Sequence, residues 1–267
     1  MKKLLIVLFL FLSALSQGQT IMNIYQSNGT VLQIPISIID SITYTVGTSG
    51  GGSIVSNPGP GVSFGGYNYA TIVLGNGQEW MSENLRTTTY ANGDPIPNVT
   101  VDSQWAALTT GAWCYYNNDP QYENPYGKLY NWYTVADPRN VCPNGWHVPD
   151  ETDWNLLVKY LDPSADTSCL VCTQSQLAGG MMKDTSALYW LSPNTGATNQ
   201  SGFSGLPYGN RAANGPFFHI GSYGNWWSSA QDSTSTARYR NLYYFDGNVN
   251  RNYYYKNSGF SVRCLRD

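Results

Sequence analysis

The stretch from residue 238 to residue 257 most constrains how this chain can fold. Its twenty positions hold six Tyr, five Asn and three Arg. That mixture is too aromatic for a disordered tail and too polar for a hydrophobic core. Residues 260–265 then alternate between apolar and polar side chains, as expected for a half-buried strand. The pattern predicts a displayed surface that one closing strand ties to a scaffold.

Tyrosine and asparagine together are suited to ligand binding. Tyr supplies a large rigid contact area at little entropic cost, and Asn supplies adaptable hydrogen bonds. A purely structural alternative is a β-hairpin with its turn at residues 246–248, in which alternate tyrosines pack inward. Both can hold, because alternation leaves half of the side chains outside. We expect a ligand face that is backed by Trp226 and Trp227 and built from Tyr239, Asn241, Tyr243, Asn248, Asn250, Asn252, Tyr253 and Tyr255.

The first nineteen residues have the pattern of a secretory signal peptide. Lys2 and Lys3 form a basic start, residues 4–12 are an unbroken apolar run, and small residues follow at 13–18. The alternative, a short N-terminal anchor, is disfavoured because the apolar run is too short to cross a bilayer. We therefore expect export to the cell surface, the periplasm or the medium, with no transmembrane segment after cleavage.

The charge balance argues against nucleic acid as a partner. The chain has 14 basic and 17 acidic residues, and loss of Lys2 and Lys3 with the signal peptide leaves 12 against 17, a net charge of −5. The remainder holds no basic block of the kind that binds nucleic acid. Charged residues make up 12% of the chain and aromatic residues 14%. This composition favours an exported binding protein over an intracellular enzyme.

A small β unit is expected at residues 20–46, after the signal peptide at 1–19. Two strand-like runs, 21–25 and 31–34, flank an Asn-Gly pair that favours a two-residue hairpin turn. A third β-like run follows at 38–44. Because three strands with one apolar face are only marginally stable alone, this unit is expected to pack on something or to pair with another copy.

A linker and a main domain complete the predicted organisation. Residues 47–66 are rich in Gly, Pro and Ser, a composition typical of a linker. In the main domain, 67–267, apolar spacing predicts one helix over 127–136 and a second that starts at the N-cap Asp150 and ends before Pro163. The last third of the chain shows only short β-like runs between Gly, Asn and Ser clusters. Two helices followed by short antiparallel strands indicate an α+β domain.

Motifs of enzymes and metal sites are missing from the sequence. It contains no HExxH, P-loop or GxGxxG pattern, and GxSxG occurs only within the Gly-rich stretch at 47–66. Its two histidines, His147 and His219, lie in strand-like apolar contexts, where a structural role is favoured. Several carboxylates could support glycosidase chemistry, but the sequence does not pair them, and the loop around Asp119 is no EF-hand. We predict no catalytic residue, no metal and no cofactor.

The five cysteines allow disulfides in an exported chain, although spacing alone leaves the connectivity open. Cys169 and Cys172 have redox-motif spacing but fall in a loop, which favours a local disulfide over two free thiols. Cys142 and Cys264 are the favoured long-range pair, which would close a loop long enough to stabilise the fold. Cys114 would then remain unpaired and buried.

Five ordered motifs resemble the Fibrobacter succinogenes major paralogous domain, a family of exported bacterial proteins. The resemblance covers roughly residues 67–267. It implies a C-type lectin-like fold, related to the branch that contains formylglycine-generating enzymes. That branch uses two closely spaced late cysteines, whereas here only Cys264 lies late in the chain. The motifs are Gly77–Leu85, Tyr126–Trp132, Cys142–Pro149, Trp226–Ser229 and Gly259–Cys264.

Two further points follow from the same resemblance. Sugar-binding lectins of this fold carry Glu-Pro-Asn or Gln-Pro-Asp calcium loops, and neither tripeptide occurs here. Target proteins of diversity-generating retroelements share the fold and vary a C-terminal surface just ahead of a closing strand, which is where the Tyr/Asn-rich stretch lies.

The sequence as a whole predicts an exported, non-enzymatic binding protein. Its partner would be a surface protein or a glycan that contacts the Tyr/Asn-rich face. One alternative is an enzyme that acts on polysaccharide or is related to formylglycine-generating enzymes. Another is a structural cell-surface protein without a specific ligand.

Overall fold

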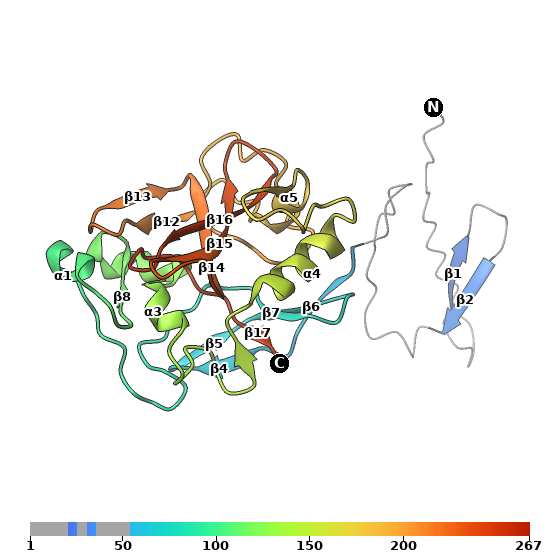
Figure 1. The fold of residues 1–267 in the computed structure, drawn as a ribbon. Helices are drawn as coiled ribbons and strands as arrows, with labels where there is room; N and C mark the ends of the chain where they lie inside the picture. Colours follow the sequence, from blue (N-terminus) through green and yellow to red (C-terminus); the bar gives the residue numbers. More distant parts are fainter. Residues whose placement is uncertain (1–20, 26–30, 36–53) are drawn as a thin grey trace. The chain divides into compact units, whose positions relative to one another are not determined.

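The computed structural model describes residues 21–25, 31–35 and 54–267 (Figure 1). The chain forms two units, Met1–Ser53 and Ile54–Asp267, and each is described by itself. Several predicted features lie outside the described residues: the signal peptide at 1–19, the Asn-Gly turn, the β-like run at 38–44 and the first part of the linker at 47–53.

The smaller unit contains the strand pair that the sequence predicted. Strand β1 (Ile21–Tyr25) pairs antiparallel with β2 (Val31–Pro35). Their register places Ile21 opposite Pro35 and Ile24 opposite Leu32.

The larger unit is a mixed α+β structure with many short strands. A five-stranded sheet has the order β10-β17-β7-β6-β3, and a four-stranded sheet has the order β11-β16-β15-β14. The strands of the first sheet are β3 (Ser56–Pro58), β6 (Thr71–Leu74), β7 (Glu79–Met81), β10 (Trp146–His147) and β17 (Leu265–Arg266). Those of the second sheet are β11 (Cys172–Ser175), β14 (Tyr223–Gln231), β15 (Thr236–Tyr243) and β16 (Val249–Tyr255).

Three two-stranded ribbons and several short helices complete this unit. The ribbons are β4 (Val62–Phe64) with β5 (Tyr67–Tyr69), β8 (Trp113–Cys114) with β9 (Leu129–Tyr130), and β12 (Tyr208–Arg211) with β13 (Phe217–Ile220). The helices are α1 (Asp102–Ala106), η2 (Tyr116–Asn118), η3 (Pro120–Tyr122), α2 (Glu123–Tyr126), α3 (Trp132–Val135), α4 (Glu151–Leu161) and α5 (Ala178–Met182). In Figure 1, β12 and β13 lie beside β14, β15 and β16.

The start of the larger unit differs from the expected linker over 47–66. Strand β3 pairs with β6, with Ser56 opposite Leu74, and β4 pairs with β5. Gly65 and Gly66, which suggested flexibility, both adopt positive φ and form the two-residue turn of the β4–β5 hairpin. The two glycines therefore form a tight turn. The backbone hydrogen bonds of the paired strands order this segment, which side-chain burial alone would not do.

Of the two predicted helices, one is confirmed and one is shorter than expected. In α4, Asp150 forms a capping box with Asp153, and the helix ends at Leu161. Over 127–136, by contrast, β9 takes up Leu129–Tyr130, and only α3 is helical. The side chain of Asn131 caps α3 by accepting a hydrogen bond from the Thr134 amide, so the apolar spacing there spans a strand and a single helical turn.

The closing segment runs through the core instead of forming one long strand. Phe260 bridges Tyr130 and Ser261 bridges Trp226, and only β17 is a regular strand. Cys264 forms a disulfide with Cys142, which is the long-range pairing that the sequence favoured. All residues from Phe260 to Leu265 are buried, so this segment joins the first strands of the unit to the four-stranded sheet.

The remaining cysteines follow the favoured assignment. Cys169 and Cys172 are bonded within their loop. Cys114 is unpaired and buried, and burial raises the pKa of its thiol to about 12. Among the helices of the described residues, none combines the length and the apolar character that crossing a membrane requires.

Candidate ligand-binding site

Strand alternation divides the predicted ligand face into two faces of the four-stranded sheet. Strands β15 and β16 pair with Tyr239 opposite Asn252 and Asn241 opposite Asn250. Successive side chains of a strand point to opposite faces, and directly paired residues share a face. Tyr239, Asn241 and Tyr243 therefore share one face with Asn250 and Asn252.

Two of the predicted tyrosines point the other way. Tyr253 pairs with Arg238 and Tyr255 pairs with Thr236, which places them on the opposite face from Tyr239. Both are exposed, at 48% and 56% of their full surface. Tyr254, which the sequence did not single out, is the β16 tyrosine that shares the face of Tyr239.

The other predicted residues have mixed positions. Trp226 and Trp227 are fully buried and donate their indole N–H groups to Asn84 Oδ1 and Tyr130 O, both at 2.8 Å. They support the face from within the core and do not contact solvent. Asn248 lies in the turn after β15, where its amide N–H bonds the Asp246 side chain. Asn250 is buried and accepts a hydrogen bond from Thr173 Oγ1 at 2.7 Å.

The far face is an internal ion network. Glu151, in the first turn of α4, pairs with Arg240 at 3.0 Å and with Arg251. Both arginines are buried, and burial lowers the pKa of Arg240 to about 10. This ion network holds α4 against the middle of the sheet and leaves only the end of the face, at Tyr253 and Tyr255, exposed. We therefore take the face of Tyr239 and Asn241 as the candidate ligand face.

A hollow of about 320 Å³ lies on the open face, between this sheet and the β12–β13 ribbon. We call it the Tyr/Asn hollow. Seven of its lining residues are aromatic, three are asparagines and one is alanine. They are Asn210, Ala212, Phe218, His219, Tyr223, Asn225, Tyr239, Asn241, Tyr243, Tyr254 and Phe260.

The three asparagines come from three different strands. Asn210, Asn225 and Asn241 lie on β12, β14 and β15 and are only 7%, 3% and 1% exposed. The Asn225 amide is fixed by donating Nδ2 to Gly209 O at 3.0 Å. The buried Oδ1 of Asn241 has no hydrogen-bond partner within the part of the chain that the structure describes. A buried acceptor left in this state costs about 1–3 kcal/mol, so a donor brought by a ligand would be favoured there.

Aromatic rings form the floor and the walls. His219 stacks on Tyr223 with ring centroids 4.2 Å apart, and Tyr223 packs against Tyr243 at 4.6 Å. Tyr239 packs on Phe260 at 4.7 Å. Tyr254 lies at 5.8 Å from Phe260 and completes the floor.

Local backbone geometry aims the His219 ring at Tyr223. His219 adopts φ +69°, a left-handed conformation that is costly for a residue with a side chain. Gly209, in the partner strand, has φ +63°, and a Cβ there would collide with the Phe218 carbonyl. The β12–β13 ribbon therefore holds strained backbone at one wall of the hollow, and this fixes the position of that wall in the absence of a ligand.

The lining of the hollow is uncharged at neutral pH. None of its residues is Asp, Glu, Lys or Arg. Burial raises the pKa of the Tyr239 and Tyr243 hydroxyls, and for Tyr243 the nearby Asn241 amide opposes part of that rise. Burial lowers the pKa of His219 below its usual 6.5, so its ring is neutral at pH 7.

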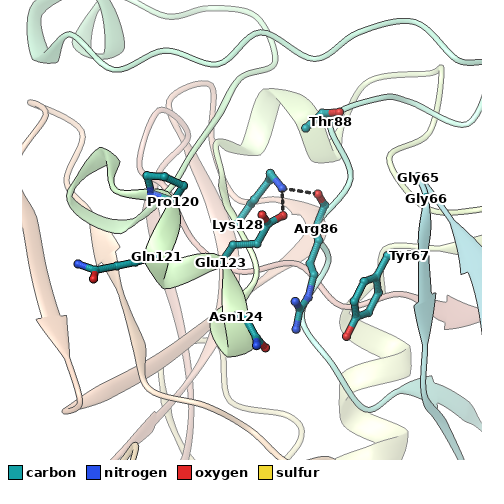
Figure 2. Close-up of a pocket in the computed structure, with 10 residues that line it drawn as sticks. All are labelled: Gly65, Gly66, Tyr67, Arg86, Thr88, Pro120, Gln121, Glu123, Asn124 and Lys128. Carbon is teal, nitrogen blue, oxygen red and sulfur yellow. Dashed lines mark hydrogen bonds and ion pairs between the residues drawn. The ribbon is translucent and has the colours of Figure 1, made fainter.

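A second, larger depression of about 530 Å³ has the opposite character. Figure 2 shows this ion-lined cleft, with Lys128 and Glu123 in its centre and Arg86 beside Tyr67. It lies between the β4–β5 turn, the segment after β7, and η3 with α2. Its lining residues are Gly65, Gly66, Tyr67, Arg86, Thr88, Pro120, Gln121, Glu123, Asn124 and Lys128.

The charges of the cleft are held by the protein itself. Lys128 is almost fully buried, donates from Nζ to Arg86 O at 2.6 Å and forms an ion pair with Glu123. Its ammonium also lies 4.9 Å from the centre of the Trp113 ring. The Arg86 guanidinium lies 4.3 Å from the centre of the Tyr67 ring. Burial lowers the pKa of Lys128, and the Glu123 carboxylate opposes that shift.

The predicted structural role suits one histidine and not the other. The His147 ring lies between Asp153 Oδ2 at 3.1 Å and Asp267 Oδ1 at 2.6 Å, and these carboxylates raise its pKa to about 9. It therefore ties the end of the closing segment to the first turn of α4. His219 instead lines the hollow, together with Asn210, Asn225 and Tyr254, none of which sequence reasoning had selected.

Most of the larger unit matches a known protein family. The family model of the Fibrobacter succinogenes major domain matches residues 73–266. No curated protein and no solved structure matches the chain. Every residue that lines the Tyr/Asn hollow lies within the matched range, whereas the β4–β5 side of the ion-lined cleft lies before it.

Proposed function

We propose that this chain, which belongs to the Fibrobacter succinogenes major domain family, is an exported, non-enzymatic binding protein. Its ligand, carried by a protein or a glycan, would dock in the Tyr/Asn hollow. A C-type lectin-like arrangement is part of the same proposal, and the short helices and antiparallel strands of the larger unit support it.

The observation that carries the proposal is the Asn241 amide. It is 99% buried, it lines an open hollow, and its Oδ1 is unpartnered among the described residues. Folded proteins satisfy most buried polar groups, and of the fourteen unsatisfied side-chain atoms among the described residues Asn241 Oδ1 is the one on a residue that lines the hollow, which supports a role in ligand binding. The surrounding tyrosines add rigid contact area of the kind that paratopes use.

The alternatives receive less support from the described residues. A glycosidase needs two carboxyl groups a few ångströms apart across its substrate, and the lining of the hollow contains neither Asp nor Glu. The oxidase alternative would place Cys264 beside Cys169 or Cys172, but the structure bonds Cys264 to Cys142. The aromatic hollow and its strained wall favour a ligand-binding protein over a structural protein without a ligand.

Export is supported by the disulfides, which form and persist in oxidising compartments. Cleavage after about residue 19 would leave the β1–β2 unit at the new N-terminus. Mass spectrometry of protein recovered outside the cytoplasm tests this directly: an intact Met1 in that material would contradict export by a cleaved signal peptide.

The binding proposal can be tested on arrays of purified glycans and purified cell-surface proteins. The double variant Tyr243→Ala/Tyr254→Ala removes one wall and part of the floor, and its signal should fall by about tenfold or more at every true ligand. Tyr133→Ala, on α3 and away from the hollow, is the matched control and should bind like the wild type. Equal binding by all three proteins would refute the proposal.

A further inference from the structure

We infer that the Tyr/Asn hollow recognises one uncharged ring that carries several hydroxyl groups, such as the pyranose of a neutral sugar. This inference rests on the proposed function, because it names the ligand class of the same site. Three properties of the hollow lead to it: its charge, the placement of its amides and its aromatic surfaces.

Charge selects a neutral ligand. No ionic side chain lines the hollow, and Tyr239, Tyr243 and His219 are uncharged at pH 7. A carboxylate, sulfate or ammonium group brought there would lose water without gaining an ionic partner, which is unfavourable. The ion-lined cleft, by contrast, is lined by Arg86, Lys128 and Glu123.

The amides favour hydroxyl groups over a peptide backbone. A side-chain amide both donates and accepts hydrogen bonds, as a hydroxyl group does. Asn225 and Asn241 are directly paired across β14 and β15, and Asn210 projects from β12 beside them, so the three amides form a row across the strands. An extended peptide usually binds along a free strand edge, but β15 is paired on both sides by β14 and β16. Neighbouring hydroxyl groups along one edge of a ring fit this row better.

The aromatic rings and the volume favour a single ring. The faces of Tyr, His and Phe rings carry partial negative charge and attract the weakly positive C–H bonds on the face of a sugar. Tyr254 and Tyr239 offer such surfaces in the floor, and the His219–Tyr223 stack offers one in the wall. A volume of about 320 Å³ is at the small end for ligand pockets, which suits one residue of a longer glycan.

The donor set also predicts binding without a divalent cation. Calcium sites are built from several oxygen ligands, carboxylates foremost among them. The hollow offers amides and phenols, and the His219 wall is already fixed by the β12–β13 backbone. The side chains of the hollow can therefore contact a neutral ring without a bound cation, and a chelator should not weaken binding.

Isothermal titration of the purified chain with methyl pyranosides of neutral hexoses and N-acetylhexosamines tests the inference, with EDTA present. At least one pyranoside should bind. Asn241→Leu keeps the side-chain shape and removes the free acceptor, so it should weaken that binding by about tenfold. Asn57→Ala, at an exposed position of β3, is the control and should leave binding unchanged. Unfolding curves of both variants verify that each remains folded.

The outcomes separate this inference from the proposed function. Binding of uronates or sulfated sugars alone, a requirement for calcium, or full binding by Asn241→Leu would overturn the neutral-ring inference. Capture of a purified surface protein that depends on Asn241, with no pyranoside bound, would overturn it too, yet the proposed function would stand. If no array ligand depended on the hollow, both would fail.

Discussion

The ion-lined cleft and the Tyr/Asn hollow differ in the charge of their lining residues and in how the main polar groups are engaged. The cleft is larger and carries charged side chains, yet Lys128 and Glu123 pair with each other and Arg86 stacks on Tyr67. The hollow is smaller and uncharged, yet the buried Asn241 Oδ1 within it has no partner among the described residues. Arg86 Nε in the cleft is unpartnered as well, so it is the uncharged lining together with the Asn241 acceptor that marks the hollow as the candidate site.

Two buried asparagines show the same contrast at the scale of single residues. Asn84, beneath the α2 wall of the cleft, accepts from Trp226 at 2.8 Å and from Arg263 at 3.2 Å and donates to Tyr126 O at 2.9 Å. Asn241 is equally buried. We assign the first amide to the fold and propose the second as a ligand contact, and substitutions can separate these roles.

Asn84→Leu should have the largest effect on stability. It removes the acceptor of the Trp226 indole and of the buried Arg263 guanidinium, and leaves the Tyr126 carbonyl without its donor. Leaving these groups without hydrogen-bond partners should lower the free energy of unfolding by about 4 kcal/mol. Urea unfolding monitored by tryptophan fluorescence measures this. A loss below about 1 kcal/mol would show that the amide is not the structural element described here.

Lys183→Met should come next, because this buried lysine holds the rim of the hollow. Its Nζ donates to Thr195 O, Tyr243 O and Asp246 O at 2.7–2.9 Å. Loss of three bonds to partly buried carbonyls should cost about 3 kcal/mol and should also weaken ligand binding through Tyr243. The control Lys159→Met removes one bond, to Ala165 O, from an exposed side chain and should cost well under half as much.

The pH dependence of the stability difference between the wild type and Lys183→Met gives an independent check. Burial lowers the pKa of Lys183 to about 8 from 10.5. Between these values the unfolded chain binds the proton more tightly than the folded chain, so the stability contributed by Lys183 rises with pH. The advantage of the wild type over Lys183→Met should therefore grow from pH 8 to pH 10. A constant difference would contradict the buried placement of the ammonium.

Lys128→Met tests the ion-lined cleft and should have a smaller effect. It leaves Arg86 O and Glu123 without their donor, but the Glu123 carboxylate is partly exposed and can be solvated. A loss of about 2 kcal/mol is expected. Binding at the Tyr/Asn hollow should not change, since the cleft is assigned only to the fold. A tenfold loss of pyranoside binding by this variant, measured by titration calorimetry, would break the distinction between the two regions.

Local signals in the sequence predicted the parts of the fold that depend on neighbouring residues. The capping box at Asp150 and the apolar spacing after it place α4 correctly, because both are written within one short segment. The composition around Gly65 and Gly66 predicts a linker, because a tight turn and a flexible segment share the same composition. Only the pairing of β4 with β5 distinguishes the two.

The candidate site depended on register and on distant strands, which composition does not encode. The Tyr/Asn-rich stretch contributes Tyr239, Asn241, Tyr243 and Tyr254 to the lining of the hollow, but the β15–β16 pairing decides whether Tyr253 or Tyr254 shares the face of Asn241, and a slip of one residue would exchange them. Asn210 and Asn225 reach the hollow from β12 and β14, and no local pattern marks them. A period-two reading of β16 would at least have separated Tyr254 from its neighbours.

Asn241→Leu should have the smallest effect on stability and is the sharpest test of the comparison. Because Oδ1 of Asn241 has no partner to lose within the described residues, replacing the amide with an apolar side chain of similar shape should change the free energy of unfolding by less than about 1 kcal/mol, and toward greater stability. Unfolding in urea beside Asn84→Leu provides the comparison under identical conditions. A protein that keeps its stability yet loses its ligand has an amide reserved for binding. Destabilisation as large as that of Asn84→Leu would instead make both asparagines structural and remove the difference between the two regions.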